Sequence, residues 1–292
     1  MDNITEKQNS KSENLNQLEV IDILDLINKE DRKIAQSVSS IMPKISYLII
    51  DIISKMKENG RLFYVGCGTS GRLGVLDASE CPPTFGVADD MVQGIIAGGY
   101  KALSKSVENA EDSYEDGYKI IDERKIIKSD IVIGISASGS ASYVHGALNS
   151  AKKNGCTTAL ICCNKIKNES YIDHLLSIVV GPEIITGSTR MKAGTATKMV
   201  LNMISTTVMV KLNKVYGNLM IDLKLKNKKL VKRAISIIMN IASVNQKTAE
   251  SFLKKAGGNL RIAIIMIKYK KTFNQSEKML DKFNFDLEKK II

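Results

Sequence analysis

The segment Gly66-Cys67-Gly68-Thr69-Ser70-Gly71 decides the fold of this chain. It follows an apolar run over residues 62–65, which is typical of a buried strand, and it precedes a helix predicted over residues 71–80. A second such loop, Ser136-Ala137-Ser138-Gly139-Ser140, follows the apolar run 131–135. Strands that alternate with helices indicate a parallel sheet covered on both faces, so the sequence predicts an α/β fold.

The rest of the pattern extends this prediction in both directions. Residues 1–16 show no periodicity and are expected to form an extended or loosely packed arm. Further strands are predicted over residues 92–97, 158–163 and 178–180, and helices over residues 17–59 (two helices), 101–123, 142–154, 193–213 and, as a wholly helical region, from about 227 onward. We therefore expect a doubly wound parallel sheet with N-terminal helices and a small C-terminal helical bundle. The predicted division is 1–53, 54–217 and 218–292.

Serine, threonine and glycine gather in three loops that we expect to bind a phosphate. The third loop is Thr186-Gly187-Ser188-Thr189-Arg190. A helix N-terminus offers unpaired N–H groups and a partial positive charge, and ligands of such sheets bind at the carboxyl ends of the strands. The candidate binding residues are Gly68, Thr69, Ser70, Ser136, Ser138, Gly139, Ser140, Ser188 and Arg190.

Neither of the common nucleotide-binding motifs fits the first loop fully. Gly66, Gly68 and Gly71 match the dinucleotide-binding fingerprint, but the next predicted strand ends in Gly98-Gly99 rather than in an acidic residue. The loop lacks the Gly-Lys-Ser/Thr of a Walker motif. Glycines that serve only a tight turn remain an alternative for one loop taken alone. Three hydroxyl-rich loops together favour a monophosphate site.

Two glutamates are candidate catalytic groups. Glu80 lies at the end of a predicted helix, where the negative end of the helix dipole raises a carboxyl pKa. Glu111 shares a predicted helix face with Glu108, and neighbouring like charges also raise a carboxyl pKa. An exposed helix-end glutamate and an ordinary solvated acidic face are the alternatives. His145 and His174 are poor catalytic candidates in their contexts.

Composition limits the partners. The net charge of +11 favours nucleic acid as a partner, but the basic runs are lysine-rich without interleaved aromatic residues, and we expect no nucleic-acid binding. No apolar run reaches about 18 residues and the polar N-terminus lacks signal-peptide features, so a cytoplasmic protein without a membrane partner is expected. Five cysteines and two histidines in no metal-binding pattern predict reduced structural thiols and no metal site.

Longer motifs resemble a known family. The first loop runs on through Asp77-Ala78-Ser79-Glu80-Cys81-Pro82-Pro83, and together with residues 108–113, residues 187–196 and Gly217-Asn218-Leu219-Met220 it closely resembles the N-acetylmuramic acid 6-phosphate etherases. These motifs keep the order and spacing of the family over most of the chain. They distinguish it from the general sugar-isomerase (SIS) domain superfamily, and they add Lys192 to the candidate binding residues.

The resemblance implies a SIS-type fold, a homodimer and no cofactor. It implies that the D-lactyl ether of N-acetylmuramic acid 6-phosphate is cleaved by elimination and hydration, which gives N-acetylglucosamine 6-phosphate and D-lactate. By position, Glu111 is then the base at C2, and Glu80 protonates the departing lactate oxygen and later activates water. An apolar segment over residues 199–210 points to a dimer as well, because one sheet face would not cover it.

One loop departs from the family pattern. The family commonly has Ser-Gly-Arg-Thr-Pro-Tyr where this chain has Ser138-Gly139-Ser140-Ala141-Ser142-Tyr143, so an arginine and a threonine are replaced. Ser140 or Ser142 is expected to supply the hydroxyl. The rival interpretation is a non-catalytic sugar-phosphate-binding regulator related to glucokinase regulatory protein. Such regulators are usually much longer, and the two retained glutamates favour the enzyme.

Overall fold

A computed structural model describes residues 3–107, 109–223, 225 and 228–282. The chain forms two compact units, Met1–Ser79 with Asp90–Thr206 and Glu80–Asp89 with Thr207–Ile292. The division predicted at 53/54 and 217/218 is a different partition and stays a prediction.

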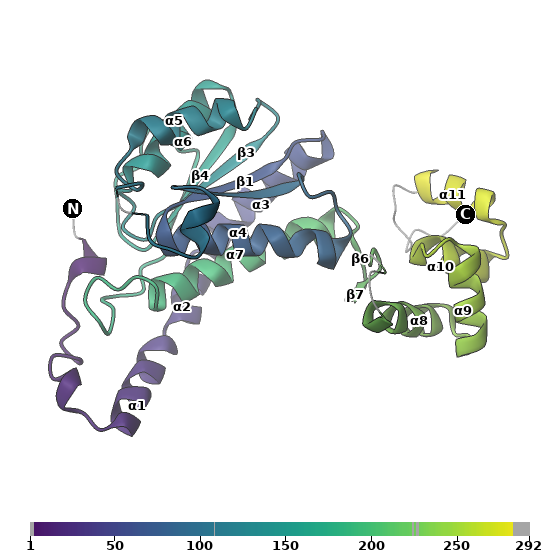
Figure 1. Cartoon of the computed structure of the whole chain (residues 1–292), viewed down its shortest axis with the longest axis horizontal. Coiled ribbons are helices and arrows are strands. Elements are labelled where there is room, and N and C mark those ends of the chain that lie inside the picture. Colours follow the sequence, from purple (N-terminus) through teal and green to yellow (C-terminus); the bar gives the residue numbers. More distant parts are fainter. Residues whose placement is uncertain (1–2, 108, 224, 226–227, 283–292) are drawn as a thin grey trace. The chain divides into compact units, whose positions relative to one another are not determined.

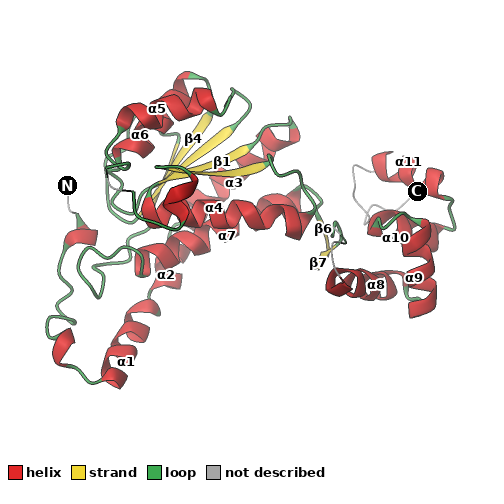
Figure 2. Cartoon of the chain, in the orientation of Figure 1, coloured by secondary structure: helices red, strands yellow, loops and turns green. Residues whose placement is uncertain are grey.

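The first unit is built on the predicted parallel sheet (Figure 2). Its strands lie in the order β2-β1-β3-β4-β5, and their bounds are β1 Leu62–Gly66, β2 Val92–Ile96, β3 Ile131–Ile135, β4 Thr157–Cys162 and β5 His174–Ser177. Gly66 at the end of β1 is paired with Ile135 at the end of β3. The first two hydroxyl-rich loops therefore leave the sheet side by side at its carboxyl edge.

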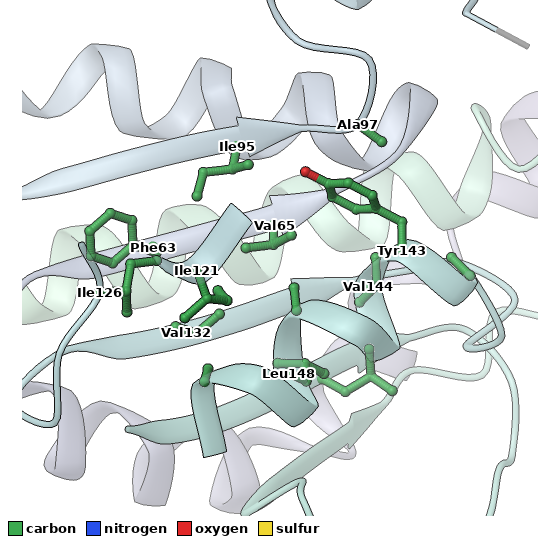
Figure 3. Close-up of a cluster of buried hydrophobic side chains, with 14 of the residues drawn as sticks. Phe63, Val65, Ile95, Ala97, Ile121, Ile126, Val132, Tyr143, Val144 and Leu148 are labelled. Carbon is green, nitrogen blue, oxygen red and sulfur yellow. The ribbon is translucent and has the colours of Figure 1, made fainter. Parts of the chain in front are cut away.

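Helices cover both faces of the sheet (Figure 1). One face carries α5 (Tyr114–Glu123) and α6 (Ser142–Lys153), and the other carries α3 (Met42–Lys57), α4 (Gly68–Phe85) and α7 (Lys192–Lys211). Because side chains alternate along a strand, Phe63, Val65 and Val132 face α5 and α6 in one buried cluster (Figure 3). Tyr64 faces α4, where Gly74 leaves room for it.

Two glycines set the position of α4. A Cβ on Gly71 would lie 2.6 Å from the carbonyl oxygen of Gly66 and 2.6 Å from Ile96. The Gly71 N–H donates to the Cys67 carbonyl at 3.1 Å. The first turn of α4 therefore lies directly against the end of β1, and only a glycine fits at the contact.

The N-terminal arm is mostly exposed, but long-range hydrogen bonds anchor it at two points. It contains two 3₁₀ turns, η1 Ile4–Glu6 and η2 Leu15–Gln17. The Thr5 N–H donates to Asn164 Oδ1 at 3.1 Å, and Ser12 Oγ donates to the Ile184 carbonyl at 2.8 Å. These partners are more than 150 residues away along the chain, so no local pattern indicated them. Three helices rather than two follow, namely α1 Val20–Asp31, α2 Ile34–Ser39 and α3.

Two predicted helix boundaries differ from the structure. The helix expected over residues 101–123 is the 3₁₀ turn η3 Tyr100–Leu103, a turn at residues 109–112, and then α5. Asn109 takes a left-handed conformation, with φ 65°, and Ser113 Oγ caps α5. Helix α4 continues through Pro82 and Pro83 and ends before Gly86, whose N–H donates to the Pro82 carbonyl at 3.0 Å.

The last strand was also misplaced. It lies at His174–Ser177 instead of residues 178–180, although the Ile178 N–H still donates to the Cys162 carbonyl at 2.8 Å. The run from Leu175 to Val180 is apolar at all but one position and marks no boundary.

The second unit is mainly helical, as predicted. Its described elements are the hairpin strands β6 Val215–Tyr216 and β7 Leu219–Met220, and the helices α8 Lys228–Ala242, α9 Gln246–Lys255, α10 Leu260–Tyr269 and α11 Phe273–Lys282. Gly217, with φ 53°, forms the hairpin turn with Asn218. The buried guanidinium of Arg261 donates to Asp222 Oδ2 at 2.7 Å and fixes α10 next to the hairpin.

Two global features complete the fold. All five cysteines are buried thiols, none of them in a disulfide. No single helix in the described part of the chain is long and apolar enough to cross a membrane; the bent pair Val20–Ser39 and Met42–Lys57 meets the criterion of length and composition only when its two parts are taken together.

Two helical glycines should respond in opposite ways to alanine. Gly71→Ala places a Cβ against backbone and should lower the free energy of unfolding by at least about 1–3 kcal/mol. Gly194→Ala in α7 meets nothing closer than 3.5 Å and should raise it by about 0.5–1 kcal/mol, because alanine favours the helix. Urea unfolding of both variants measures the difference. Equal stabilities would show that the contact at Gly71 does not set the position of α4.

Candidate functional site

A cavity of about 390 Å³ opens at the carboxyl edge of the sheet, within the first unit. Five segments line it: the loop after β1, the loop after β3, the turn that carries Glu111, the loop around residue 187, and the N-terminal arm. The lining residues are Asn3, Glu6, Cys67, Gly68, Thr69, Ser70, Glu111, Ile135, Ser136, Ala137, Ser138, Ser140, Ala141, Gly187 and Thr189.

The loop after β1 presents helix donors to the cavity. Gly68 has φ 49°, which lets the chain turn sharply into α4. Gly68, Thr69 and Ser70 occupy the first turn of this 18-residue helix, where N–H groups lack intrahelical acceptors. Thr69 and Ser70, which carry hydroxyls, line the cavity as well. This combination suits an anionic oxygen cluster such as a phosphate.

The loop after β3 is shaped by its own serines. Buried Ser136 Oγ accepts from the Gly139 N–H at 3.1 Å and from the Ala141 N–H at 3.4 Å. Ser138 Oγ accepts from the N–H and the hydroxyl of Ser140. Ser136 therefore holds the turn, whereas Ser138 and Ser140 offer hydroxyls to the cavity. Ser142 begins α6 and is not among the lining residues.

Glu111 lies in a turn and not on a helix face, so the helix-face interpretation was wrong for this residue. Its carbonyl accepts the Tyr143 N–H at 3.0 Å, which fastens the turn to the first turn of α6. Partial burial, and secondly the charge of Asp112, raise the pKa of the Glu111 carboxyl. Glu108, the other glutamate of the motif, lies outside the described residues.

Glu80 does not line this cavity. It is exposed, belongs to the second compact unit, and lies inside α4, which runs on to Phe85. The structure thus brings Glu111 together with the phosphate-type loops and leaves the role of Glu80 a prediction.

The third loop lines the cavity through Gly187 and Thr189, whereas Ser188 and Arg190 are not lining residues. Lys192 is 1% exposed, and its ammonium donates to Glu30 Oε2 at 2.8 Å. The Glu183 carboxylate accepts the N–H groups of Lys192 and Ala193 at 3.0 and 2.9 Å and so caps α7. The amine of Lys192 is therefore occupied in fixing the loop.

Asn3, Glu6 and Thr189 line the cavity and have polar side chains, but they were not among the sequence-based candidates. Thr189 stood inside the third loop and could have been selected there. Asn3 and Glu6 belong to the N-terminal arm, whose sequence has no periodic pattern. Only the folded structure shows that they lie in the cavity wall. None of the lining residues that the structure describes is a lysine or an arginine. Hydroxyls and helix N–H groups are therefore the hydrogen-bond donors that they offer to an anion.

A smaller cavity of about 290 Å³ adjoins the first and shares Asn3, Ser138 and Ser140 with it. His145 stands in its wall, with Nδ1 3.0 Å from the Tyr171 hydroxyl and Nε2 2.9 Å from the Gly139 carbonyl. The imidazole thereby supports the loop after β3.

Similar sequences extend over nearly the whole chain. N-acetylmuramic acid 6-phosphate etherase 1 of Bacillus licheniformis is 46% identical over 286 residues, which cover 98% of this chain and 94% of that protein. N-acetylmuramic acid 6-phosphate etherase of Clostridium acetobutylicum is 50% identical over 279 residues, which cover 95% and 92%. This chain belongs to the N-acetylmuramic acid 6-phosphate etherase family.

Shorter matches place this etherase-family chain in its wider superfamily. Residues 44–152 match the N-terminal SIS domain of glucokinase regulatory protein, and residues 217–261 match its C-terminal lid domain. The phosphoheptose isomerase of Neisseria gonorrhoeae superposes with a TM-score of 0.50 at 11% identity, over 65% of this chain and 98% of that chain. This likeness shows the fold alone, and it agrees with the SIS-type sheet predicted for the etherase family.

Ser70 should contribute to phosphate binding in this etherase-family site. Ser70→Ala removes a hydroxyl from the cavity, and a hydrogen bond to a charged group contributes about 1.5–3 kcal/mol, so affinity for N-acetylglucosamine 6-phosphate should fall about ten- to hundredfold. Ser79→Ala is the control, because Ser79 lies on the same helix outside the cavity. Titration calorimetry measures both. Equal affinities of the two variants would remove Ser70 from the site.

Proposed function

We propose that this protein cleaves the D-lactyl ether of N-acetylmuramic acid 6-phosphate. Water is consumed, and the products are N-acetylglucosamine 6-phosphate and D-lactate. The observation that carries the proposal is the match to etherases over 98% of the chain. The cavity supports it, because it offers helix N–H groups and hydroxyls for a phosphate next to a carboxyl group with a raised pKa.

The regulatory alternative is less well supported. The two segments that match glucokinase regulatory protein, residues 44–152 and 217–261, leave much of the chain outside the match. The etherases match nearly full length, with 94% of the Bacillus licheniformis protein covered. The protein is therefore an enzyme. Only an activity assay that showed binding without turnover would favour the non-catalytic regulator instead.

Glu111 is suited to act as the base. In the open-chain sugar the C1 aldehyde acidifies the C2 proton, and a carboxylate with a raised pKa is a stronger base than an ordinary one. Removal of that proton forms the C2–C3 double bond as the C3–O bond to lactate breaks. Water then adds at C3 and a proton returns to C2, which restores a saturated sugar phosphate.

Glu80 is proposed as the acid that protonates the lactate oxygen and later activates the water. This assignment rests on its motif, because Glu80 is exposed and outside the described cavity lining. The C3–O bond breaks and forms without a change of oxidation state, and the protein has to supply only proton transfers, so the proposal includes no cofactor and no metal. We place the reaction in the cytoplasm, with a small amino-sugar phosphate as the ligand.

We further propose a homodimer, on different grounds from those in the sequence. Val200, Leu201 and Ile204 of α7 are fully buried within the chain, so most of the apolar segment 199–210 needs no partner to cover it, although Val210 is 40% exposed. Helix α1 does need a partner to cover it, because its apolar side chains Val20, Ile21 and Leu24 are 74%, 70% and 57% exposed. An apolar helix face of this kind is typical of a protein interface.

Exchange of the C2 proton with solvent separates the two carboxyl groups. Glu111→Gln should abolish deuterium incorporation at C2, because the amide cannot accept the proton. Glu80→Gln keeps the base and should retain that exchange while lactate release falls. Each change should lower turnover by about 10²–10⁴-fold, the usual contribution of a positioned acid or base.

Mass spectrometry of the sugar phosphate and an enzymatic D-lactate assay give the two readouts, and thermal melts control for folding. Exchange at the parent rate in Glu111→Gln would rule out Glu111 as the base. Absence of D-lactate from the parent protein, beside an active family enzyme, would favour the regulator.

The dimer can be tested through α1. Light scattering of the parent should give about twice the 32.1 kDa chain mass. The double variant Val20→Asp, Ile21→Asp should shift the protein toward the single-chain mass, because burying carboxylates at an interface is unfavourable. Asp22→Asn, also exposed on α1, is the control. A parent that scatters as a single chain at assay concentration would refute the dimer.

A further inference from the structure

The N-terminal arm is part of the substrate cavity, a feature that the catalytic scheme does not use. Asn3 and Glu6 line the cavity together with the phosphate-type loops. The Glu6 carboxylate lies against Gly187, since a Cβ on Gly187 would be 3.2 Å from Glu6 Oε2. No hydrogen bond or ion pair engages this carboxylate among the residues that the structure describes, so it is available to a ligand.

Asn164 fastens the arm to the loop after β3. Its Oδ1 accepts the Thr5 N–H at 3.1 Å, and its Nδ2 lies within hydrogen-bond distance of Asn3 Oδ1 (2.7 Å), Thr5 Oγ1 (3.0 Å) and the Ser138 carbonyl (3.0 Å). Asn164 is 2% exposed and Thr5 is 1% exposed. One buried amide thus joins the wall that carries Glu6 to the loop that carries Ser138.

The chemistry of the cavity limits what Glu6 can contact. A carboxylate only accepts hydrogen bonds, and it repels a phosphate. The hydroxyls and helix N–H groups of residues 68–70 and 136–141 supply the donors that a phosphate needs. Glu6 is therefore suited to contact the part of an amino-sugar phosphate that lies away from the phosphate, where hydroxyl and amide N–H groups are neutral hydrogen-bond donors.

We propose that Glu6 is a specificity-determining residue that accepts hydrogen bonds from hydroxyl or amide N–H groups of the sugar, and that Asn164 is the positioning residue that holds it there. The assignment rests on the proposed function for the identity of the sugar, because it needs a ligand that carries neutral donors as well as a phosphate. Selection of a sugar phosphate over a bare phosphate is the property that Glu6 confers.

Binding measurements with two ligands, a sugar phosphate and inorganic phosphate, distinguish this role of Glu6 from a general disruption of the site. Glu6→Ala should weaken binding of N-acetylglucosamine 6-phosphate about ten- to hundredfold, the effect expected for a lost hydrogen bond to a charged group. Binding of inorganic phosphate should be unchanged or slightly tighter, because a like charge is removed. Glu13→Gln, exposed on the same arm and outside the cavity, is the control and should match the parent for both ligands.

Asn164→Ala tests the positioning role. Amide hydrogen exchange at Thr5 should become faster, and the loss of sugar-phosphate affinity should not add to that of Glu6→Ala in the double variant. Thermal melts establish that the variants are folded. If Asn164→Ala does not fold, the Glu6 variants decide the matter alone.

Three results would overturn the proposal: equal weakening of both ligands in Glu6→Ala, no weakening of either, or a parent protein that binds no sugar phosphate. Failure of the proposed function is a distinct result. A parent that binds N-acetylglucosamine 6-phosphate but releases no D-lactate from the etherase substrate would refute the reaction, while the binding comparison would still test Glu6.

Discussion

The contact between the backbone at Gly66 and the first turn of α4 at Gly71 is the constraint on which the site depends. With no side chain on either residue, the helix begins directly at the end of strand β1. Its unpaired N–H groups are thereby aimed into the space above the sheet edge. Because β1 and β3 are adjacent and in register, the serine loop after β3 reaches the same space. A bulkier residue at either glycine would displace the donors that define the anion site.

Charged groups in the interior hold the remaining walls in place. Burial by itself would raise the pKa of Glu30, but hydrogen bonds from Lys192 and Lys33 lower it to about 2. The same carboxylate accepts a hydrogen bond from Asn9 of the arm at 3.3 Å. Glu183 caps α7 by accepting the N–H groups of Lys192 and Ala193. Buried ion pairs contribute little net stability in general, and here they fix the geometry of the arm and of the loop that carries Thr189.

The sequence predicted the elements that are built from neighbouring residues, and it missed the contacts between residues that lie far apart in the chain. Strand, hydroxyl loop and helix follow each other within about 25 residues at both phosphate-type loops, so periodicity and glycine placement were sufficient for them. The turn at Glu111 was mistaken for helix because an acidic, helix-compatible run gives no sign of the left-handed Asn109. The place of Glu6 in the cavity depends on contacts of the arm with Asn164, far away in the chain. The apolar segment 199–210 indicated burial correctly, but its cover comes from within the chain.

The buried cysteines give this protein a chemical reporter of its own motions. Burial raises the pKa of Cys67 and of Cys163 to about 12 and that of Cys156 to about 11, so almost none of these thiols is ionised at neutral pH. Alkylating reagents react with the thiolate, and modification therefore has to wait until the surrounding structure opens. Cys67 stands at the end of β1 in the cavity wall, whereas Cys156 and Cys163 flank β4. The relative labelling rates of these three positions would measure, residue by residue, how often the carboxyl edge of the sheet, at Cys67 and Cys163, opens compared with its amino edge at Cys156.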